Sequence, residues 1–146
     1  MPKFKSLKAA LEYIEKAKSD SMKNLGECVE NIMKEEIQTQ VYDAYKPKYY
    51  ERTNQFIDSV EVTDISDDRV EISWRDNGDW YSVINRAKGE DDHMYVIHGH
   101  EMGKVWGVGG YRPQTNLVEE STRRAEYEVP DELIKLLGSK GIKVRR

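Results

Sequence analysis

The chain has 146 residues, enough for one domain, and its 38% hydrophobic and 34% charged residues predict a lean core under a charged surface. The formal net charge is −4, with acidic and basic residues interleaved, which argues against a dedicated DNA-binding protein. One cysteine excludes an internal disulfide framework and fits a reducing compartment. No apolar run approaches the ~20 residues that span a bilayer, and the N-terminus lacks the apolar stretch of a signal peptide. We therefore expect a protein made in the cytoplasm, with no membrane partner.

An amphipathic helix is predicted from Ser6 to about Tyr45. Ser6 can cap it, and apolar residues recur at steps of three and four over residues 7–41. The polar triplet at 19–21 competes for backbone hydrogen bonds, which leaves two alternatives: one long helix, or a short helix followed by a longer one. Pro47 sets the end, because a residue before proline disfavours helical dihedrals.

A β-hairpin is predicted next. Residues 60–65 and 69–75 alternate apolar and polar side chains, and Ser66-Asp67-Asp68 can form the turn between them. Asp76-Asn77-Gly78-Asp79 is a second strong turn signal, and short β-prone runs follow it as candidates for further strands.

Two short helices are predicted near the C-terminus. Thr115 can cap the first, Pro130 suits the first turn of the second, and Gly138 can close it. The basic residues 139–146 form either a loose tail or a contact arm for an acidic neighbour. The expected architecture is α+β in a single domain, residues 1–146: a helix or helix pair at about 6–45, a small antiparallel sheet with loops at about 56–110, short helices at about 115–138 and a basic tail at 139–146.

All three histidines, His93, His98 and His100, fall in one window beside Glu101. On a strand, His98 and His100 would point the same way, so these two and a carboxylate form a weak candidate metal site. Because no histidine elsewhere completes a ligand set, we expect a polar loop with no metal and no cofactor. A small metal-dependent hydrolase using His98 and His100 remains an alternative.

Other catalytic signals are weaker still. No Gly-x-Ser-x-Gly occurs, and Cys28 lies in the middle of a predicted helix, where a thiol is usually buried and inert. The glycines of GKVWGVGGYRP lack the Gly-Lys-Ser/Thr ending of a phosphate loop, so a flexible loop is the better interpretation. We expect no enzymatic activity.

Tyrosines gather at the end of the predicted N-terminal helix, at Tyr42, Tyr45, Tyr49 and Tyr50. One interpretation is a stacking platform for single-stranded nucleic acid, with Tyr42 to Tyr50 beside nearby lysines and Arg52. The favoured interpretation is a structural corner, where aromatic rings seal the bend between helix and sheet and their hydroxyls reach water.

As a spaced pattern, this corner resembles a family of small tailed-bacteriophage virion proteins of the neck and tail-completion (minor tail component) type. The residues that carry the resemblance are Tyr42, Tyr45, Pro47, Tyr50, Arg52, Thr53, Phe56 and Ser59. Gly109, Gly110, Tyr111, Arg112 and Pro113 look like the family's closing loop. The resemblance covers residues 6–125 and leaves 126–146 outside it. Asn54 stands where the family favours glycine, although asparagine also tolerates left-handed dihedrals.

The resemblance implies a structural rather than an enzymatic role. Copies of such proteins form a ring at the head–tail junction or the top of the tail, next to other neck, tail-terminator or tail-tube proteins and near the DNA in the channel. It implies location in the virion after assembly in the host cytoplasm. The candidate subunit-contact loop consists of Trp106, Gly109, Gly110, Tyr111, Arg112 and Pro113.

Overall fold

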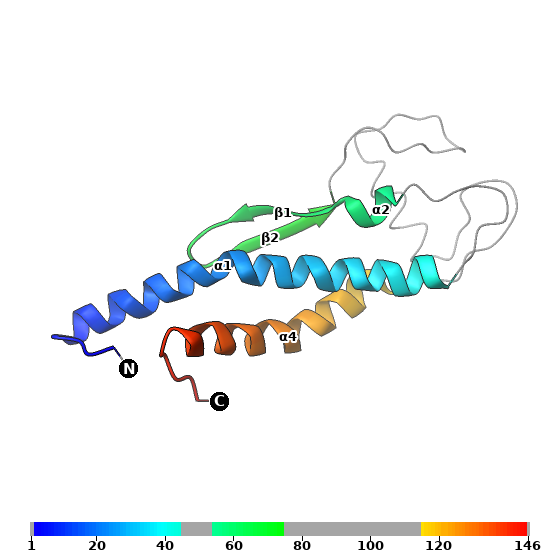
Figure 1. Cartoon of the computed structure of the whole chain (residues 1–146). Helices are drawn as coiled ribbons and strands as arrows, with labels where there is room; N and C mark the ends of the chain where they lie inside the picture. The colour runs from blue at the N-terminus through cyan, green and yellow to red at the C-terminus, as the bar shows by residue number, and fades with distance from the viewer. Residues whose placement is uncertain (1, 45–53, 75–114, 146) are drawn as a thin grey trace, which may run out of the picture.

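The computed structural model describes residues 2–44, 54–74 and 115–145. In this part of the chain, a long helix lies between a β-hairpin on one side and a second long helix on the other (Figure 1). The elements in chain order are α1 (Leu7–Ile37), the π-helix η1 (Gln38–Asp43), α2 (Gln55–Asp58), β1 (Val60–Ile65), β2 (Val70–Trp74) and α4 (Leu117–Ser139). The predicted α+β fold, with a long N-terminal helix beside an antiparallel sheet, is confirmed.

Helix α1 is continuous, so the first of the two alternatives for the N-terminal segment is correct. Its N-cap is Ser6, whose Oγ accepts a hydrogen bond from the backbone N–H of Ala9 at 3.2 Å. The helix does not break at the polar triplet, because the hydroxyls of Ser19 and Ser21 find partners compatible with the helix. Ser21 donates to the carbonyl of Ala17 one turn earlier, and Ser19 donates to Asp67 in the hairpin turn.

The helix ends in a π-helical turn that regular periodicity does not predict. In η1 the side-chain amide of Gln38 donates to Asp43, five residues on, at 2.7 Å, which suits the wider π turn. The turn carries Val41, which is buried, and Tyr42, which packs against the core.

The hairpin lies where the alternation of residues predicts it. Strands β1 and β2 pair antiparallel, with Val60 opposite Trp74 and Ile65 opposite Val70, and an irregularity in register follows Val62. The backbone N–H of Ser66 donates to the carbonyl of Arg69 at 2.8 Å and closes the predicted turn. The candidate strands after residue 75 lie outside the described residues.

The hairpin packs closely on α1 at Gly26. A Cβ atom built on Gly26 would lie 2.9 Å from Val70 Cγ1 and 3.2 Å from Val62 Cγ2. A side chain here would require Val70 to shift, so the glycine allows this close approach of helix and sheet.

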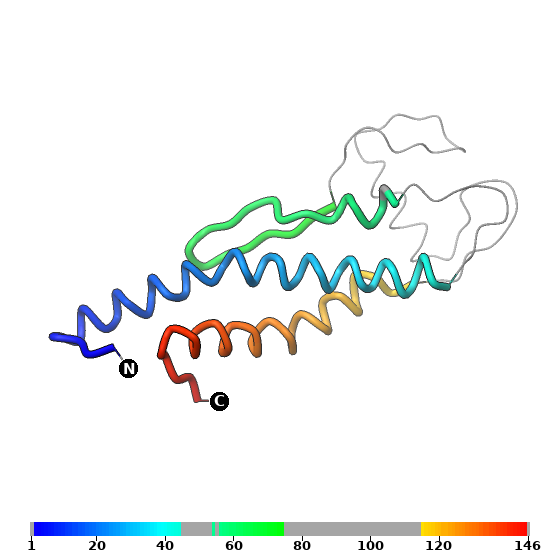
Figure 2. Tube along the Cα trace, viewed as in Figure 1, coloured from blue at the N-terminus to red at the C-terminus, as the bar shows by residue number. Residues whose placement is uncertain are grey.

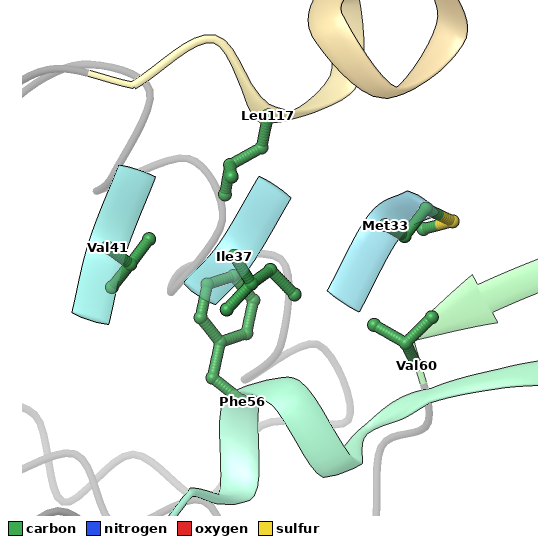
Figure 3. Packing of buried hydrophobic residues seen from close by; sticks show 6 residues of the cluster. All are labelled: Met33, Ile37, Val41, Phe56, Val60 and Leu117. Atoms are coloured by element: carbon green, nitrogen blue, oxygen red, sulfur yellow. The ribbon is translucent and has the colours of Figure 1, made fainter. Parts of the chain in front are cut away.

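The main hydrophobic core lies near the C-terminal end of α1 (Figure 3). Ile37 and Val41 meet Phe56 from α2, while Val60 and Leu117 enter from β1 and α4. Each of these five side chains is at most 6% exposed. Three segments far apart in the sequence therefore meet around one end of the long helix.

The C-terminal segment forms one helix, so the prediction of two short helices is wrong. Pro130 lies inside α4 rather than at the start of a second helix. Proline lacks an N–H and crowds the preceding turn, but packing along α1 holds the helix together across it. The helix also begins one residue later than predicted, with Asn116 instead of Thr115 at its N-cap.

The predicted closure of this helix at Gly138 is also wrong, because the helix continues past it. Gly141 adopts a left-handed φ of 79°, its N–H donates to the carbonyl of Gly138, and the N–H of Ile142 donates to Leu137. This is a Schellman motif, which satisfies the last carbonyls of the helix. Ser139 and Lys140 thus belong to the helix end rather than to a loose tail.

Candidate functional site

Of the predicted candidate sites, the tyrosine corner lies partly within the described residues. Tyr42 packs against the core, and its hydroxyl accepts a hydrogen bond from the backbone N–H of Ile57 at 3.3 Å. This contact ties the end of the long helix to α2. Tyr42 thus joins the end of the long helix to the hydrophobic core and to α2.

Asn54 begins the return of the chain toward the hairpin. It has a left-handed φ of 59°, and it is the one residue other than glycine with positive φ among residues 2–44, 54–74 and 115–145. Its carbonyl accepts a hydrogen bond from the N–H of Asp58 at 3.0 Å, which completes the single turn of α2. Asparagine adopts this conformation at lower cost than other side chains, so it can replace the glycine that the resembled family favours.

Phe56 and Ser59 lie on either side of this turn. Phe56 enters the hydrophobic core, while the buried hydroxyl of Ser59 donates to the carbonyl of Phe56 at 2.7 Å. Val60 follows at 1% exposed and starts the first strand. The motif residues that the structure describes thus fix the entry of the chain into the sheet.

A network of polar side chains holds the start of α4 against the end of α1. The guanidinium of Arg124 contacts Glu35 at 2.8 Å, Glu36 at 3.1 Å and Glu128 at 2.8 Å. Glu36 also accepts from the side-chain amide of Gln40 at 2.7 Å. Because the side chains of Arg124 and Glu36 are only 24% and 14% exposed, solvent screens their contact less than a surface pair.

The same network extends to the N-terminus of α4. The side-chain carbonyl of Gln40 accepts a hydrogen bond from the backbone N–H of Asn116 at 2.8 Å. Hydrogen bonds with Glu128 and with Glu35 raise the pKa of Arg124, so the guanidinium stays charged. The side chains of Arg124 and Gln40 thus position the first half of α4 against α1.

The other end of α4 is fastened to α1 by Lys140. Its backbone carbonyl accepts a hydrogen bond from the hydroxyl of Tyr13 at 2.8 Å, and its ammonium lies 3.3 Å from the carboxylate of Asp20. The two helices therefore run antiparallel and are tied at both ends (Figure 2). The start of the predicted basic tail is thus used within the molecule.

Cys28 is half-buried on α1, near α4. Burial raises the pKa of its thiol, and the carboxylates of Glu132 and Glu128 raise it further. The thiol form is therefore favoured, which does not suit a nucleophile.

Most other predicted site residues lie outside the described residues. They are Tyr45, Pro47, Tyr50, Arg52, Thr53, His98, His100, Glu101, Trp106, Gly109, Gly110, Tyr111, Arg112 and Pro113. In the described ranges, no group of three or more histidine, cysteine or acidic side chains is placed to hold a metal ion. No helix in this part of the chain is both long and apolar enough to span a membrane.

Sequence reasoning missed the residues that join the two long helices. Arg124 and Glu128, four residues apart on a helix, are a visible local signal. The contacts of Arg124 with Glu35 and Glu36 cross almost ninety positions, and no local pattern indicates them. Gln40 and Tyr13 gave no signal either.

Comparison with known proteins gives one result. The sequence matches the model of the family described as YomN over residues 3–139. No curated protein matches, and no solved structure matches. The matched range runs from before α1 to the end of α4, so it includes residues 126–139, which the resemblance to phage neck proteins left out. The family name is associated with a prophage, so the match supports a phage-related origin. The chain therefore belongs to the YomN family.

Proposed function

We propose that the protein is a non-enzymatic virion structural protein of a tailed phage or prophage. Copies assemble into a ring at the head–tail junction or at the top of the tail, where the ring serves tail completion or head–tail joining. The observation that carries this proposal is the YomN match over residues 3–139, together with the resemblance of the tyrosine corner to neck and tail-completion proteins.

The described architecture supports a structural role. Two long antiparallel helices and a hairpin are fastened to one another by the core and by the network around Arg124. In the part of the chain that the structure describes, exposed charged residues form pairs on outward faces, such as Lys23 with Glu27. A rigid subunit with a polar surface suits repeated contacts with copies and with other particle proteins.

The contacts of the corner favour this role over single-stranded nucleic-acid binding. Stacking requires ring faces that a base can reach, and Tyr42 is half-buried with its hydroxyl engaged by Ile57. The hydrolase alternative depends on His98 and His100, and no described residue favours it. Partners in the proposed role are further copies and other neck, tail-terminator or tail-tube proteins, with DNA passing nearby.

The test is to delete the gene from the phage or prophage that carries it and to examine the particles. We expect DNA-filled heads and free tails that fail to join, restored by supplying the protein in trans. In wild-type particles, the protein should be detected by mass spectrometry at several copies per virion. Normal infectious particles without the protein would contradict the proposal.

A further inference from the structure

The first three turns of α1 carry an exposed apolar surface. We define the N-terminal stripe as Leu7, Leu11 and Ile14, which are 77%, 51% and 42% exposed. Steps of four and three place the three side chains on one helix face. These three large apolar side chains form a continuous exposed row rather than lying singly on the surface.

The stripe continues a face of α1 that is buried further along. Leu25 and Ile32, which follow Leu11 at multiples of seven residues, lie on the same face and are 7% and 2% exposed. Figure 1 shows why the burial stops: α1 extends beyond the turn of the hairpin and beyond the end of α4. The hairpin turn reaches α1 at Ser19, whose hydroxyl donates to Asp67 at 2.7 Å. The hairpin therefore leaves the stripe face of residues 7–18 uncovered over about 18 Å, at 1.5 Å per residue, while another face of this segment contacts the end of α4 through Tyr13.

The charges beside the stripe select a partner helix. The apolar positions follow a heptad pattern, in which Lys8 and Glu15 flank the same edge of the seam. In an antiparallel pair of identical helices centred between Glu12 and Tyr13, Leu11 faces Ile14 of the other copy. Lys8 then faces Glu15 of the other copy, twice by symmetry.

A parallel pair lacks this complementarity. It would place Glu15 opposite the small side chain of Ala10 and leave Lys8 without an acidic partner. Lys8 does lie 3.9 Å from Glu12 in its own helix, but side chains that are 86% and 64% exposed gain little from such a contact.

The length of the uncovered face agrees with a pair centred between Glu12 and Tyr13. Residues 7 and 18 are equally distant from it, so Leu7 of one copy faces the aliphatic stem of Lys18 of the other. Overlap then ends one residue before Ser19, where the hairpin begins to cover the helix. A single register thus satisfies the apolar contacts, the charge pairs and the length of the uncovered face.

We propose that the N-terminal stripe is a self-association surface, at which two copies of the chain pair antiparallel through residues 7–18 of α1. This inference rests on the self-association in the proposed function. Such a contact is two-fold and joins two subunits, so closing a ring requires a second, different contact. Three turns of helix bury less than the roughly 1,200 Å² of a stable interface, so the pair dissociates readily at low concentration.

Site-directed cross-linking tests the direction of pairing. Lys8→Cys and Glu15→Cys are made in separate, differently tagged chains, each with Cys28→Ser to remove the native thiol. The two are mixed and treated with a short bis-maleimide. We expect the yield of cross-links between the two variants to exceed the yield that random pairing gives. Each variant alone should cross-link poorly. Random yields, or preferential cross-linking of identical positions, would overturn the antiparallel pair.

Charge exchange tests the same register without cross-linking. In sedimentation equilibrium, Lys8→Glu and Glu15→Lys should each raise the Kd of self-association at least about threefold, because like charges then face one another. The double variant should return to within about twofold of the wild type. Lys16→Glu, on the opposite face, is the charge-matched control and should leave Kd unchanged. Failure of the double variant to restore association would overturn the register.

The variant Leu11→Asp separates association from folding. Leu11 is exposed, so the thermal unfolding midpoint should stay within a few degrees of the wild type while self-association is lost. A wild-type protein that stays monomeric at millimolar concentration would overturn the pairing even if it is found in virions. Antiparallel pairing by a protein absent from virions would overturn the proposed function and leave the pairing intact.

Discussion

The hydroxyl of Tyr42, in the π turn that ends the long helix, accepts a hydrogen bond from the backbone N–H of Ile57 at 3.3 Å. This side-chain hydrogen bond joins η1 to the short helix α2 in front of the sheet. The ring itself packs against the core formed by Ile37, Phe56 and their neighbours. Tyr42 therefore connects η1 to α2 through both its ring and its hydroxyl.

Removing the hydroxyl should weaken this connection and keep the ring packing. We expect Tyr42→Phe to lower the free energy of unfolding by about 1 kcal/mol, because the partly buried N–H of Ile57 loses this acceptor. Urea titration followed by circular dichroism measures the change. Tyr127→Phe, at a side chain 68% exposed, is the matched control and should leave the midpoint in place. Equal stability of the two variants would show that the contact contributes nothing.

Arg124 is expected to contribute more to stability than Arg123, the other arginine of α4. Arg124→Ala should lower the free energy of unfolding by about 1–3 kcal/mol, because Glu36 is left largely buried beside two further carboxylates. Arg123→Ala is the matched control, since Arg123 is adjacent, 58% exposed and paired with Glu120 three residues earlier in the same helix. The difference between the variants should shrink in 1 M salt, at a Debye length of about 3 Å. Similar losses in both variants would contradict the proposed role of Arg124.

The sequence predicts what depends on neighbouring residues. The periodicity over residues 7–41 predicts α1, and the alternation around Val60 and Ile72 predicts the hairpin, because both patterns reflect one buried face. The preference of asparagine for left-handed dihedrals allows the observed conformation of Asn54.

The prediction fails where distant packing overrides a local preference. Pro130 favours the start of a helix, yet contact between α4 and α1 keeps the helix continuous across it. Gly138 can end a helix, yet Gly141 does so, because glycine permits a terminus without requiring one. For the candidate site, local pattern marks Tyr42 and Phe56 but not Arg124, whose partners on α1 are set by tertiary structure.

The exposed stripe illustrates the same limit. Leu7, Leu11 and Ile14 continue the periodic pattern that indicates a core-facing helix. Their burial depends on whether the hairpin and α4 cover this face of the first three turns. The hairpin ends before them, and the end of α4 meets α1 at Tyr13, on another face. Periodicity identifies an apolar face, but only the lengths of the packed elements decide how much of it is covered.

The thiol of Cys28 should react slowly in the folded protein. Burial and the nearby carboxylates of Glu132 and Glu128 raise its pKa, so less thiolate is present at pH 8–9 than in the unfolded chain (about 8.5 for a free cysteine). Iodoacetamide labelling followed by mass spectrometry should therefore be slower for the folded than for the urea-unfolded protein. Glu132→Gln should speed labelling modestly without changing the fold.

The same shift gives a pH dependence of stability with a definite sign. The unfolded chain loses its thiol proton first as pH rises, because the folded pKa is the higher of the two. The contribution of Cys28 is thus complete below the unfolded pKa and is lost as pH rises through the folded pKa. Cys28→Ala should flatten the fall in stability on the alkaline side; an unchanged slope would contradict the assignment.

Two glycines in long helices should respond oppositely to alanine. In an exposed helix interior, Gly→Ala gains about 0.8–1 kcal/mol. Gly138 lies in the last turn of α4, where an added Cβ would meet no neighbouring group within 4 Å, and should show part of this gain. Gly26→Ala introduces a methyl group 2.9 Å from Val70 and 3.2 Å from Val62, whose branched side chains have little rotameric freedom. Overpacking costs about 1–3 kcal/mol and should exceed the gain.

Thermal and urea unfolding of the two variants measure this difference directly. The midpoint of Gly138→Ala should rise, while that of Gly26→Ala should fall, because α1 and the hairpin can separate only by giving up contacts around Val62 and Val70. Intrinsic helix propensity favours alanine at both sites, and more at Gly26 in the middle of α1 than at Gly138 in the last turn of α4, so a fall for Gly26→Ala can only come from packing. A rise for both variants would mean that the hairpin moves freely over α1, and that Gly26 is not needed for the close approach of helix and sheet.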